Sequence, residues 1–362
     1  TEAGHNVALA STIHFVIGDQ IEPNLFKMTM PGHAYLQTFL RRALDAGCTH
    51  VVLEMTSEGA TQFRHKGIEL DALVFTNLQP EHLESHGGLE AYAQAKLSLA
   101  EHLAKSPKPR RIVVANLDDA YGARFLETPV EVRAPFSLKD AEPYNVDDSS
   151  VRFVFRRELF SVPLPGLFNL RNILAALTLG EAMHIPLPTM QRALARVTPI
   201  AGRAERIERG QNFIVVVDYA HTPDSLRALL ETYGSRRIIC VMGSTGGGRD
   251  QWKRPLMGSI ADELCISTYL TNEDPYDENP RDIVEAIAQG FSSHTPHIIL
   301  DRREAIHAAL KEALTLRQEE GSQQVAVLIT GKGTDPFIMG PQGSKETWSD
   351  KVVTEEGLDK LL

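Results

Sequence analysis

The chain has 362 residues, which is too long for one ordinary hydrophobic core and predicts two domains. Its 43% hydrophobic and 23% charged residues are typical of a soluble globular protein, and no apolar run is long enough to span a membrane. The formal net charge of −10 argues against nucleic-acid binding, and the amino-terminal residues lack the pattern of a signal peptide. Three widely spaced cysteines argue against a disulfide framework and a cysteine zinc site, and they fit a cytoplasmic protein.

Apolar runs of strand length alternate with helical patterns along most of the chain. The elements expected in the first half are strands at 51–53, 72–75 and 112–114 and helices at 89–103, 169–182 and 188–196. Residues 126–165 differ, because they are rich in Pro, Asp and Ser and carry alternating Val151, Phe153 and Phe155. This stretch predicts an antiparallel or irregular insert.

The second half repeats the alternation more cleanly. Its expected strands lie at 213–217, 237–242, 266–270, 297–300 and 325–329, and its expected helices at 223–233, 253–264, 280–290 and 302–316. Alternating strands and helices predict a mostly parallel sheet of the α/β class. The pattern breaks at 198–202, so we place the domain boundary there, with domains at 1–199 and 200–362.

A carboxylate and an imidazole follow the apolar strand at 213–217. Asp218 and His221 lie where this strand ends, and Thr222 and Pro223 suit the cap and first turn of the helix that follows. In an open α/β sheet, this edge is where ligands bind. Asp218 and His221 are therefore candidate ligand contacts, with simple turn formation as the alternative.

Glycine-rich loops follow two other expected strands of the second half. The loops at 243–250 and 331–335 can present backbone N–H groups to an anion, although neither matches G-x-x-x-x-G-K-[ST]. Arg203 lies beside the flexible Gly202 at the domain boundary, from which a guanidinium can bind a phosphate in a bidentate manner. An ordinary surface position is the alternative for Arg203.

Polar residues in the first half form a more dispersed set. Glu54 and His82 each follow an expected strand, and we expect both at the carboxyl edge of one sheet, where they could share a divalent cation. Lys96 lies within a helix, where a surface lysine is the commoner case. Asn169 and Asn172 share one face near a helix start, where an amide can cap the helix or hydrogen-bond a purine edge.

Together these motifs resemble the Mur ligases, the ATP-dependent amide-forming enzymes of peptidoglycan synthesis. The closest resemblance is to the branch that adds the third residue of the stem peptide, the UDP-N-acetylmuramoyl-tripeptide synthetases. The matching stretches, in the order of the family, are 54–57, 76–78, 81–86, Tyr92 with Lys96, 168–172, 202–203, 218–223, 248–255 and 331–333. The resemblance implies a Mur ligase central domain that is incomplete at its amino terminus, with a mostly parallel sheet and a small antiparallel part. A Rossmann-like carboxy-terminal domain is implied after it.

The resemblance also implies roles for individual residues. The implied catalytic and metal-binding residues are Glu54, His82 and Lys96. Lys96 matches a lysine that is carbamylated in this family, and the carbamate helps to hold magnesium. The implied nucleotide contacts are Asn169, Asn172, Arg203, Asp218 and His221. Ser57, Gln62 and Arg64 match positions near the UDP-muramoyl-peptide, and the incoming amino acid is held at positions matched by Arg249, Asp274, Gly331 and Asp335.

The implied reaction uses ATP and Mg²⁺. ATP phosphorylates the carboxylate of UDP-N-acetylmuramoyl-L-alanyl-D-glutamate, and the amine of an amino acid then attacks the acyl phosphate and releases phosphate. Magnesium and arginine stabilise charge on the transferred phosphoryl group. We expect a monomer with no nucleic-acid or membrane partner.

One element of the family pattern is missing. No Gly-Lys-Thr/Ser phosphate-binding loop occurs anywhere in the chain, and the family's UDP-binding amino-terminal domain is missing too. We therefore expect a fragment of a ligase that forms no amide bond alone, and a gene product that has lost catalysis is the alternative. A non-catalytic muramoyl-peptide or amino-acid binding protein, and a related ligase such as folylpolyglutamate or cyanophycin synthetase, are the other hypotheses.

The amino acid added is open at this point. Ligases that add diaminopimelate carry Asp-Asn-Pro-Arg, whereas this chain has Glu273, Asp274, Pro275 and Tyr276 in the aligned stretch. A tyrosine hydroxyl cannot supply the charged clamp of an arginine to a distal carboxylate. Lysine, another amino acid, or diaminopimelate held by other residues are the possibilities. Glu58 also stands where this branch usually has histidine.

Overall fold

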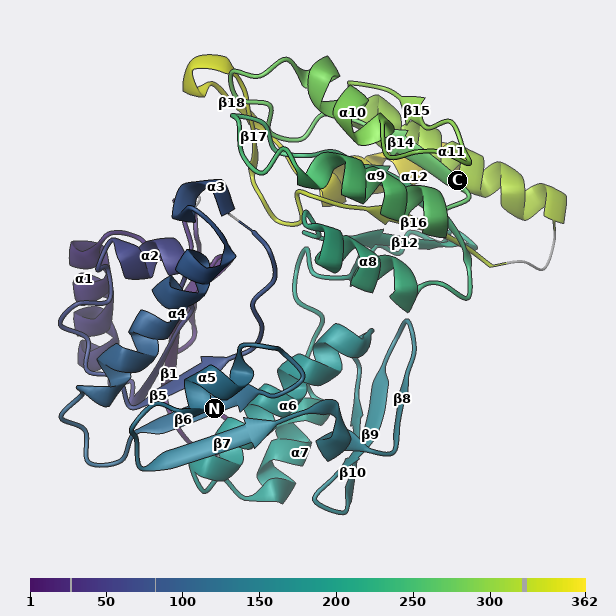
Figure 1. Ribbon diagram of the computed structural model, residues 1–362. Coiled ribbons are helices and arrows are strands. Elements are labelled where there is room, and N and C mark those ends of the chain that lie inside the picture. Colours follow the sequence, from purple (N-terminus) through teal and green to yellow (C-terminus); the bar gives the residue numbers. More distant parts are fainter. Residues whose placement is uncertain (27, 82, 321–323) are drawn as a thin grey trace. The chain divides into compact units, whose positions relative to one another are not determined.

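The computed structural model describes residues 1–26, 28–81, 83–320 and 324–362. The chain forms two compact units, which Figure 1 draws mainly from purple to teal and from green to yellow. The first unit consists of Thr1–Val146, Val151–Pro163 and Phe168–Val197, and the second of Asp147–Ser150, Leu164–Leu167 and Thr198–Leu362. The domain limits 1–199 and 200–362 stay a prediction. No helix in the described part of the chain has the length and apolar character needed to cross a membrane.

Three sheets form the first unit. One has the order β3-β2-β1-β4, with β1 (Val7–Ala10), β2 (His14–Ile17), β3 (Gln20–Pro23) and β4 (His50–Leu53). A parallel sheet contains β5 (Ala72–Phe75), β6 (Ile112–Asn116) and β7 (Val132–Phe136), and an antiparallel sheet contains β8 (Tyr144–Val146), β9 (Val151–Phe155) and β10 (Glu158–Val162). The central strand β6 is buried along its whole length, as its apolar sequence predicts for a parallel strand.

Two expectations about this unit are wrong. Strand β4 pairs with β1 and strand β5 pairs with β6, so Glu54 does not lie at the edge of the sheet that contains β5. Strand β7 runs parallel to β6, although it lies in the stretch expected to be antiparallel or irregular. Apolar periodicity identifies a strand but not its partner, and Pro135 makes β7 look unlike a strand. An edge strand tolerates this proline because it needs hydrogen bonds on one side only.

Seven helices accompany these sheets in the described part of the first unit. They are α1 (His33–Asp45), α2 (Ser57–Thr61), α3 (Leu83–His86), α4 (Leu89–Ala104), α5 (Gly122–Leu126), α6 (Leu167–Ala182) and α7 (Leu187–Ala195), with a short 3₁₀ turn η1 (Leu138–Ala141). Helices α4 and α5 pack against the parallel sheet, where the rings of Phe75 and Phe125 stack with centroids 4.0 Å apart. The helices expected near 89–103, 169–182 and 188–196 are confirmed.

The second unit is built on a six-stranded sheet of order β11-β12-β16-β13-β14-β15. Its strands are β11 (Glu205–Arg206), β12 (Ile214–Val217), β13 (Arg237–Met242), β14 (Ser267–Leu270), β15 (His297–Ile298) and β16 (Val325–Ile329), and all but β11 run parallel. The predicted parallel sheet is therefore confirmed. A hairpin of β17 (Phe337–Met339) and β18 (Lys345–Thr347), with a 3₁₀ turn η2 (Pro341–Gly343), was not expected.

Helices cover both faces of this sheet (Figure 1). The contacts join α8 (Pro223–Thr232) to α9 (Lys253–Leu264) and α9 to α10 (Pro280–Ala288), while α11 (Arg302–Glu320) packs on β13, β14 and β16 beside α12 (Asp350–Leu361). The helices expected near 223–233, 253–264, 280–290 and 302–316 are confirmed, and α12 was missed. The core between these layers includes Val215, Ile239, Val327, Ile306 and Leu310.

Asp262 ties helix α9 to the loop that follows α10. Its carboxylate accepts the backbone N–H groups of Ser292 at 3.0 Å, Ser293 at 2.9 Å and His294 at 2.9 Å. Burial alone would raise the pKa of Asp262, but these hydrogen bonds outweigh it and hold the pKa well below its usual value. The unfolded chain therefore binds more protons than the folded chain at acid pH, and stability from this group rises with pH.

Replacing Asp262 with alanine is expected to cost about 2 kcal/mol at pH 7, the value typical of hydrogen bonds to a charged group. The cost should be constant above about pH 5 and should shrink as the pH falls through about 3.9, where the unfolded carboxyl takes up its proton. Urea unfolding followed by tryptophan fluorescence measures it, with Glu263→Ala, an exposed neighbour, as the control. A loss that stays the same from pH 7 to pH 3 would contradict this assignment.

Candidate functional site

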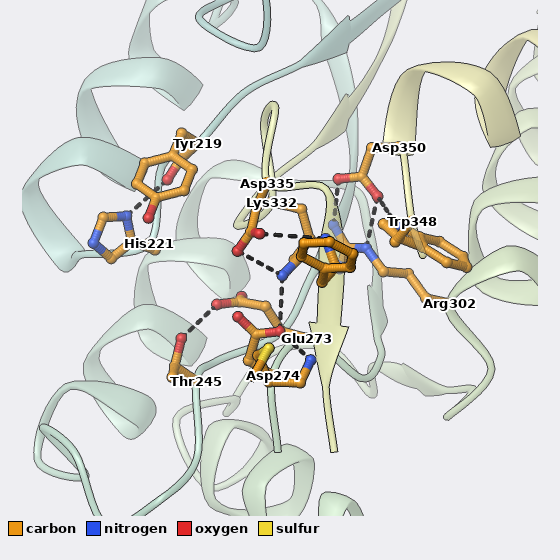
Figure 2. A network of polar contacts seen from close by, with 12 residues as sticks. Tyr219, His221, Thr245, Glu273, Asp274, Arg302, Lys332, Asp335, Trp348 and Asp350 are labelled. Atoms are coloured by element: carbon orange, nitrogen blue, oxygen red, sulfur yellow. Dashed lines mark hydrogen bonds and ion pairs between the residues drawn. The ribbon is translucent and has the colours of Figure 1, made fainter. Parts of the chain in front are cut away.

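The carboxyl ends of β13, β14 and β16 meet at one edge of the second unit's sheet, because these strands are parallel neighbours. The loops that follow them contain several of the predicted amino-acid contacts. Figure 2 shows the polar contacts of these loops, among them those of Lys332 with Asp274 and Asp335 and that of Thr245 with Glu273. We call this group of contacts the polar network.

Lys332 lies at the centre of the network. Its Nζ is 2.8 Å from Oδ1 of Asp274 and 2.9 Å from Oδ2 of Asp335, and only 1% of its side chain is exposed. Asp274 Oδ1 also accepts the backbone N–H of Met339 at 2.7 Å. Two predicted amino-acid contacts, Asp274 and Asp335, are thus brought together by a lysine to which the sequence assigned no separate role. Its position between two loop glycines was the available signal.

Glu273 is a second residue that sequence reasoning did not single out. Its Oε1 accepts a hydrogen bond of 2.9 Å from the hydroxyl of Thr245, and the residue is 3% exposed. Among the described residues, its Oε2 has no hydrogen-bond partner. Gly331 packs directly against this carboxylate with φ of +102°, and a Cβ there would collide with Glu273 Oε2. Only glycine can lie this close to the carboxylate with this backbone conformation. Gly331, a predicted amino-acid contact, therefore packs directly against Glu273.

Arg249 and Tyr276 lie at the rim of the same edge. The exposed Arg249 guanidinium is 5.3 Å from the centre of the Tyr276 ring, within the range of a cation–π contact. Burial, followed by the negative charge of Asp274, raises the pKa of the Tyr276 hydroxyl. Tyr276 therefore stays neutral and supports Arg249 through its ring.

A buried ion pair holds the ends of β14 and β16 together (Figure 2). Arg302 donates to Asp350 at 2.8 and 2.7 Å, and neither side chain is exposed to solvent. The same guanidinium donates to the carbonyls of Asn272, at 3.3 Å, and Thr330, at 2.7 Å. Trp348 Nε1 donates to Asp350 at 2.8 Å. Sequence reasoning missed this group because charged residues at helix starts usually face solvent.

Asp218 organises the turn after β12. Its Oδ2 accepts the N–H of Ala204 and its Oδ1 that of Ala220, both at 2.6 Å. Burial raises the pKa of Asp218, and these two hydrogen bonds and the charge of Arg203 oppose the rise. The hydroxyl of Thr222 caps α8 through the N–H of Ser225, as predicted. These hydrogen bonds support turn formation, the alternative role of Asp218. Its contact with a nucleotide stays a prediction.

Arg203 and His221 are brought together by Tyr219. The Arg203 guanidinium is 4.5 Å from the centre of the Tyr219 ring, and the rings of Tyr219 and His221 are 4.7 Å apart. His221 Nδ1 lies 2.8 Å from the carbonyl oxygen of Tyr219. The turn at Gly202, with φ of +63°, packs against the backbone of Gly333, so these residues adjoin the loop that carries Lys332.

In the first unit, Glu54 and Lys96 lie in a common electrostatic environment. Glu54 Oε2 accepts two hydrogen bonds from Thr12, one from the backbone N–H at 2.7 Å and one from the side-chain hydroxyl at 2.9 Å. Burial lowers the pKa of Lys96, and the carboxylates of Glu81, Glu54 and Asp119 oppose the change. His82, the third predicted catalytic and metal-binding residue, lies outside the described residues.

The carboxylate oxygens of Glu54, Glu81 and Asp119 suit magnesium, because this ion binds carboxylates and keeps several of its waters. Among the residues that the structure describes, however, no three His, Cys, Asp or Glu side chains form a ready metal cage. A site with few protein ligands, completed by water and phosphate oxygens, is the arrangement these residues can support.

The predicted muramoyl-peptide contacts lie on one short segment. Ser57 begins α2, is buried, and has its hydroxyl 3.1 Å from His86 Nε2. Gln62 follows the helix and accepts a hydrogen bond of 3.0 Å from Arg64 Nε. Arg64 also donates to the carbonyl oxygen of Met30. Ser57, Gln62 and Arg64 are therefore neighbours along the chain with their own internal hydrogen bonds.

The predicted nucleotide contacts are divided between the two units. Asn169 and Asn172 lie in the first turns of α6, where Asn169 is half-buried and Asn172 is exposed. Arg203, Asp218 and His221 belong to the second unit. The members of each group lie close together in the chain within one unit. A nucleotide role shared by the two groups stays a prediction.

Comparisons with known proteins give the family. A model described as the Mur ligase middle domain matches residues 3–180, and one described as the Mur ligase, glutamate ligase domain matches residues 202–333. The UDP-N-acetylmuramoyl-L-alanyl-D-glutamate--2,6-diaminopimelate ligase of Caldanaerobacter subterraneus is 33% identical over 350 residues, covering 93% of this chain and 69% of that protein. The chain belongs to the Mur ligase family.

Other Mur ligases support this assignment. A diaminopimelate ligase of the same description from Listeria monocytogenes is 33% identical over 379 residues, covering all of this chain and 74% of the relative. A solved structure of a diaminopimelate ligase is 30% identical with a TM-score of 0.61, covering 99% of this chain and 73% of that one. A Mycobacterium tuberculosis folylpolyglutamate synthase complexed with ADP has a TM-score of 0.69 at 16% identity, covering 99% of this chain and 85% of that one, which shows a shared fold alone.

Proposed function

We propose that this Mur ligase chain belongs to an ATP-dependent enzyme that adds the third amino acid to UDP-N-acetylmuramoyl-L-alanyl-D-glutamate through an acyl phosphate. The observation that carries the proposal is the network around Lys332. Its charged side chains, Asp274 and Asp335, stand with Gly331 and Arg249 at the sheet edge where such folds bind ligands.

In this proposal, the second unit holds the incoming amino acid and contacts the nucleotide. Arg249, Asp274, Gly331 and Asp335 surround the amino acid. Arg203 binds a phosphate and His221 faces the nucleotide, while Asp218 contacts the ribose and also fixes their turn through its two backbone hydrogen bonds.

The first unit supplies the remaining contacts. Asn169 and Asn172 bind the adenine edge, and Ser57, Gln62 and Arg64 bind the UDP-muramoyl-peptide. Glu54, His82 and Lys96 hold Mg²⁺, which when bound supplies charge stabilisation for phosphoryl transfer. We propose that Lys96 is carbamylated in the active enzyme, as the resemblance to the family implies.

The remaining expectations follow from this function. We propose that the protein works in the cytoplasm, where nucleotide-linked cell-wall precursors are made, as a monomer without nucleic-acid or membrane partners. A non-catalytic homologue that binds the muramoyl-peptide or the amino acid is the second candidate. Residues 1–362 contain no Gly-Lys-Thr/Ser loop, so the two candidates are separated by experiment.

A ligation assay separates the two candidates. Residues 1–362 are incubated with ATP, Mg²⁺, UDP-N-acetylmuramoyl-L-alanyl-D-glutamate and a panel of amino acids, alone or fused to an amino-terminal segment of the Listeria ligase chosen to carry the family's phosphate loop. We expect muramoyl-tripeptide from the fusion and none from residues 1–362 alone. Turnover by residues 1–362 alone would refute the need for the loop. A fusion that binds ATP and the dipeptide but forms no amide would favour the binding protein.

A further inference from the structure

A cavity of about 380 Å³ lies at the amino ends of β12, β13 and β16 in the second unit. Its volume is within the range of about 300–1,000 Å³ that is usual for small-molecule sites. The candidate site of this unit lies at the carboxyl ends of the same parallel strands, so the two places are a strand length apart, about 16 Å for the five residues of β16. The cavity is therefore distinct from the predicted amino-acid and nucleotide contacts.

The wall of this cavity is rich in arginine. Arg206 ends β11, Arg236 comes directly before β13, and Arg317 lies in the last turn of α11. Among the described residues that line the cavity, the one acidic side chain is that of Glu208, which is exposed. The whole chain has a formal net charge of −10, so this local excess of positive charge stands out from its surroundings. It favours an anionic ligand.

Two of these arginines share a single carboxylate. Arg206 donates to Oδ1 of Asp148 at 3.1 Å, and Arg236 donates to Oδ2 of the same residue at 2.5 Å. Asp148 is 13% exposed and belongs to Asp147–Ser150, a segment that packs in the second unit. Arg236 also donates to the side-chain oxygen of Gln324, which carries no charge. One carboxylate thus pairs with two guanidinium groups, and a second anion nearby would balance their charge.

Guanidinium groups are well suited to bind that second anion. Each has five N–H donors in a planar fork, and a carboxylate or phosphate group can accept two of them side by side. The contact of Arg206 with Asp148 uses part of this set, so a further acceptor can bind from the cavity. Arg317 also suits its place for another reason, because a basic residue in the last turn of a helix interacts favourably with the helix dipole. Arg206 and Arg236 are therefore the main candidate anion contacts.

The loop between β11 and β12, which forms one side of the cavity, is fixed by its own hydrogen bonds. Gln211 donates to the carbonyl oxygen of Ile207 at 2.6 Å and accepts the backbone N–H of Arg209 at 2.7 Å. A ligand therefore does not have to order this loop when it binds, which lowers the free-energy cost of binding.

We propose that this cavity binds the oxyanion group of a small molecule, a carboxylate or a phosphate, through Arg206 and Arg236. The site is separate from the ligase function proposed above and does not depend on it. A ligand that binds only the folded chain also raises its free energy of unfolding, so the bound anion stabilises the second unit.

Calorimetric titration of residues 1–362 with pyrophosphate and with citrate, without Mg²⁺ and at constant ionic strength, tests the proposal. We expect at least one of the two anions to bind with a Kd below about 1 mM. Arg206→Gln should weaken that binding at least about tenfold, as for a hydrogen bond between charged groups, and Arg206→Lys should weaken it less. Glu208→Gln should strengthen it, because the like charge beside the anion is removed. The anion that binds more tightly identifies phosphate or carboxylate as the preferred group.

Two matched variants show where the anion binds. Arg209→Gln removes the same charge three positions away, from a side chain that is 42% exposed, pairs with Asp359 and is not among the residues that line the cavity. Arg203→Gln removes the predicted phosphate contact of the candidate site. Both variants should leave the affinity unchanged.

Three results would overturn the proposal. They are no binding of either anion at millimolar concentrations, equal losses in the Arg206 and Arg209 variants, and a loss in Arg203→Gln alone. A gain of affinity in Glu208→Gln is a result that a folding defect cannot produce, so the test does not depend on the stability of the arginine variants. Because the titration needs neither ATP nor the dipeptide, it succeeds or fails independently of the ligation assay.

Discussion

Replacing Arg302 with leucine is expected to lower the free energy of unfolding of the second unit by about 3–5 kcal/mol, the usual cost of breaking a buried ion pair. The leucine leaves Asp350 buried without its cation, and the carbonyl groups of Asn272 and Thr330 lose a donor. Urea unfolding followed by tryptophan fluorescence measures the change, since both tryptophans of the chain, Trp252 and Trp348, lie in this unit.

Two further variants make the Arg302 test specific. Arg281→Leu breaks an exposed i,i+4 pair with Glu285, whose side chain is 55% exposed, and should cost less than about 0.5 kcal/mol. The double variant Arg302→Leu with Asp350→Leu should recover part of the lost stability, because it removes the uncompensated charge. Equal losses in the Arg302 and Arg281 variants would refute the role of burial.

Replacing Lys332 with methionine is expected to cost about 3 kcal/mol, because Asp274 and Asp335 lose the ammonium group that pairs with both of them. The same substitution should loosen the loop after β16 and weaken amino-acid binding at least about tenfold. Urea unfolding measures the first effect, and calorimetric titration of residues 1–362 with L-lysine and meso-diaminopimelate measures the second.

The matched control for Lys332 is Lys351→Met. Lys351 pairs with Glu205 at 2.7 Å, but its side chain is 48% exposed, so its loss should cost less than about 1 kcal/mol and leave amino-acid binding intact. A Lys332 variant that binds lysine as tightly as the unaltered chain would show that the network does not shape the amino-acid site.

The success of sequence reasoning differed between the two units. In the second unit, continuous apolar runs such as those of β13 and β16 marked buried parallel strands, and their helices followed in order. In the first unit, β2 and β3 were missed because their apolar segments are short, and α1 was missed too. The separation of β4 from β5 was missed because periodicity carries no information about strand partners.

The residues of the candidate site also divide into those that the local sequence marks and those that it does not. Asp218, Arg249 and Gly331 could be proposed from the sequence because they lie in loops that follow predicted strands. Glu273 was not singled out because nothing in its local sequence marks a buried carboxylate with a free oxygen.

The sequence by itself determined the order of the strands and helices from β12 to β16 in the second unit, the capped turn after β12 and, through its motifs, the resemblance to the Mur ligases. These features depend on local periodicity, helix capping and short spacings, which a single chain displays directly. The partners of Lys332, Arg302 and Glu273 emerged only in the folded chain. Asp274 lies 58 positions and Asp350 48 positions from its cationic partner, and burial made these distant contacts energetically important.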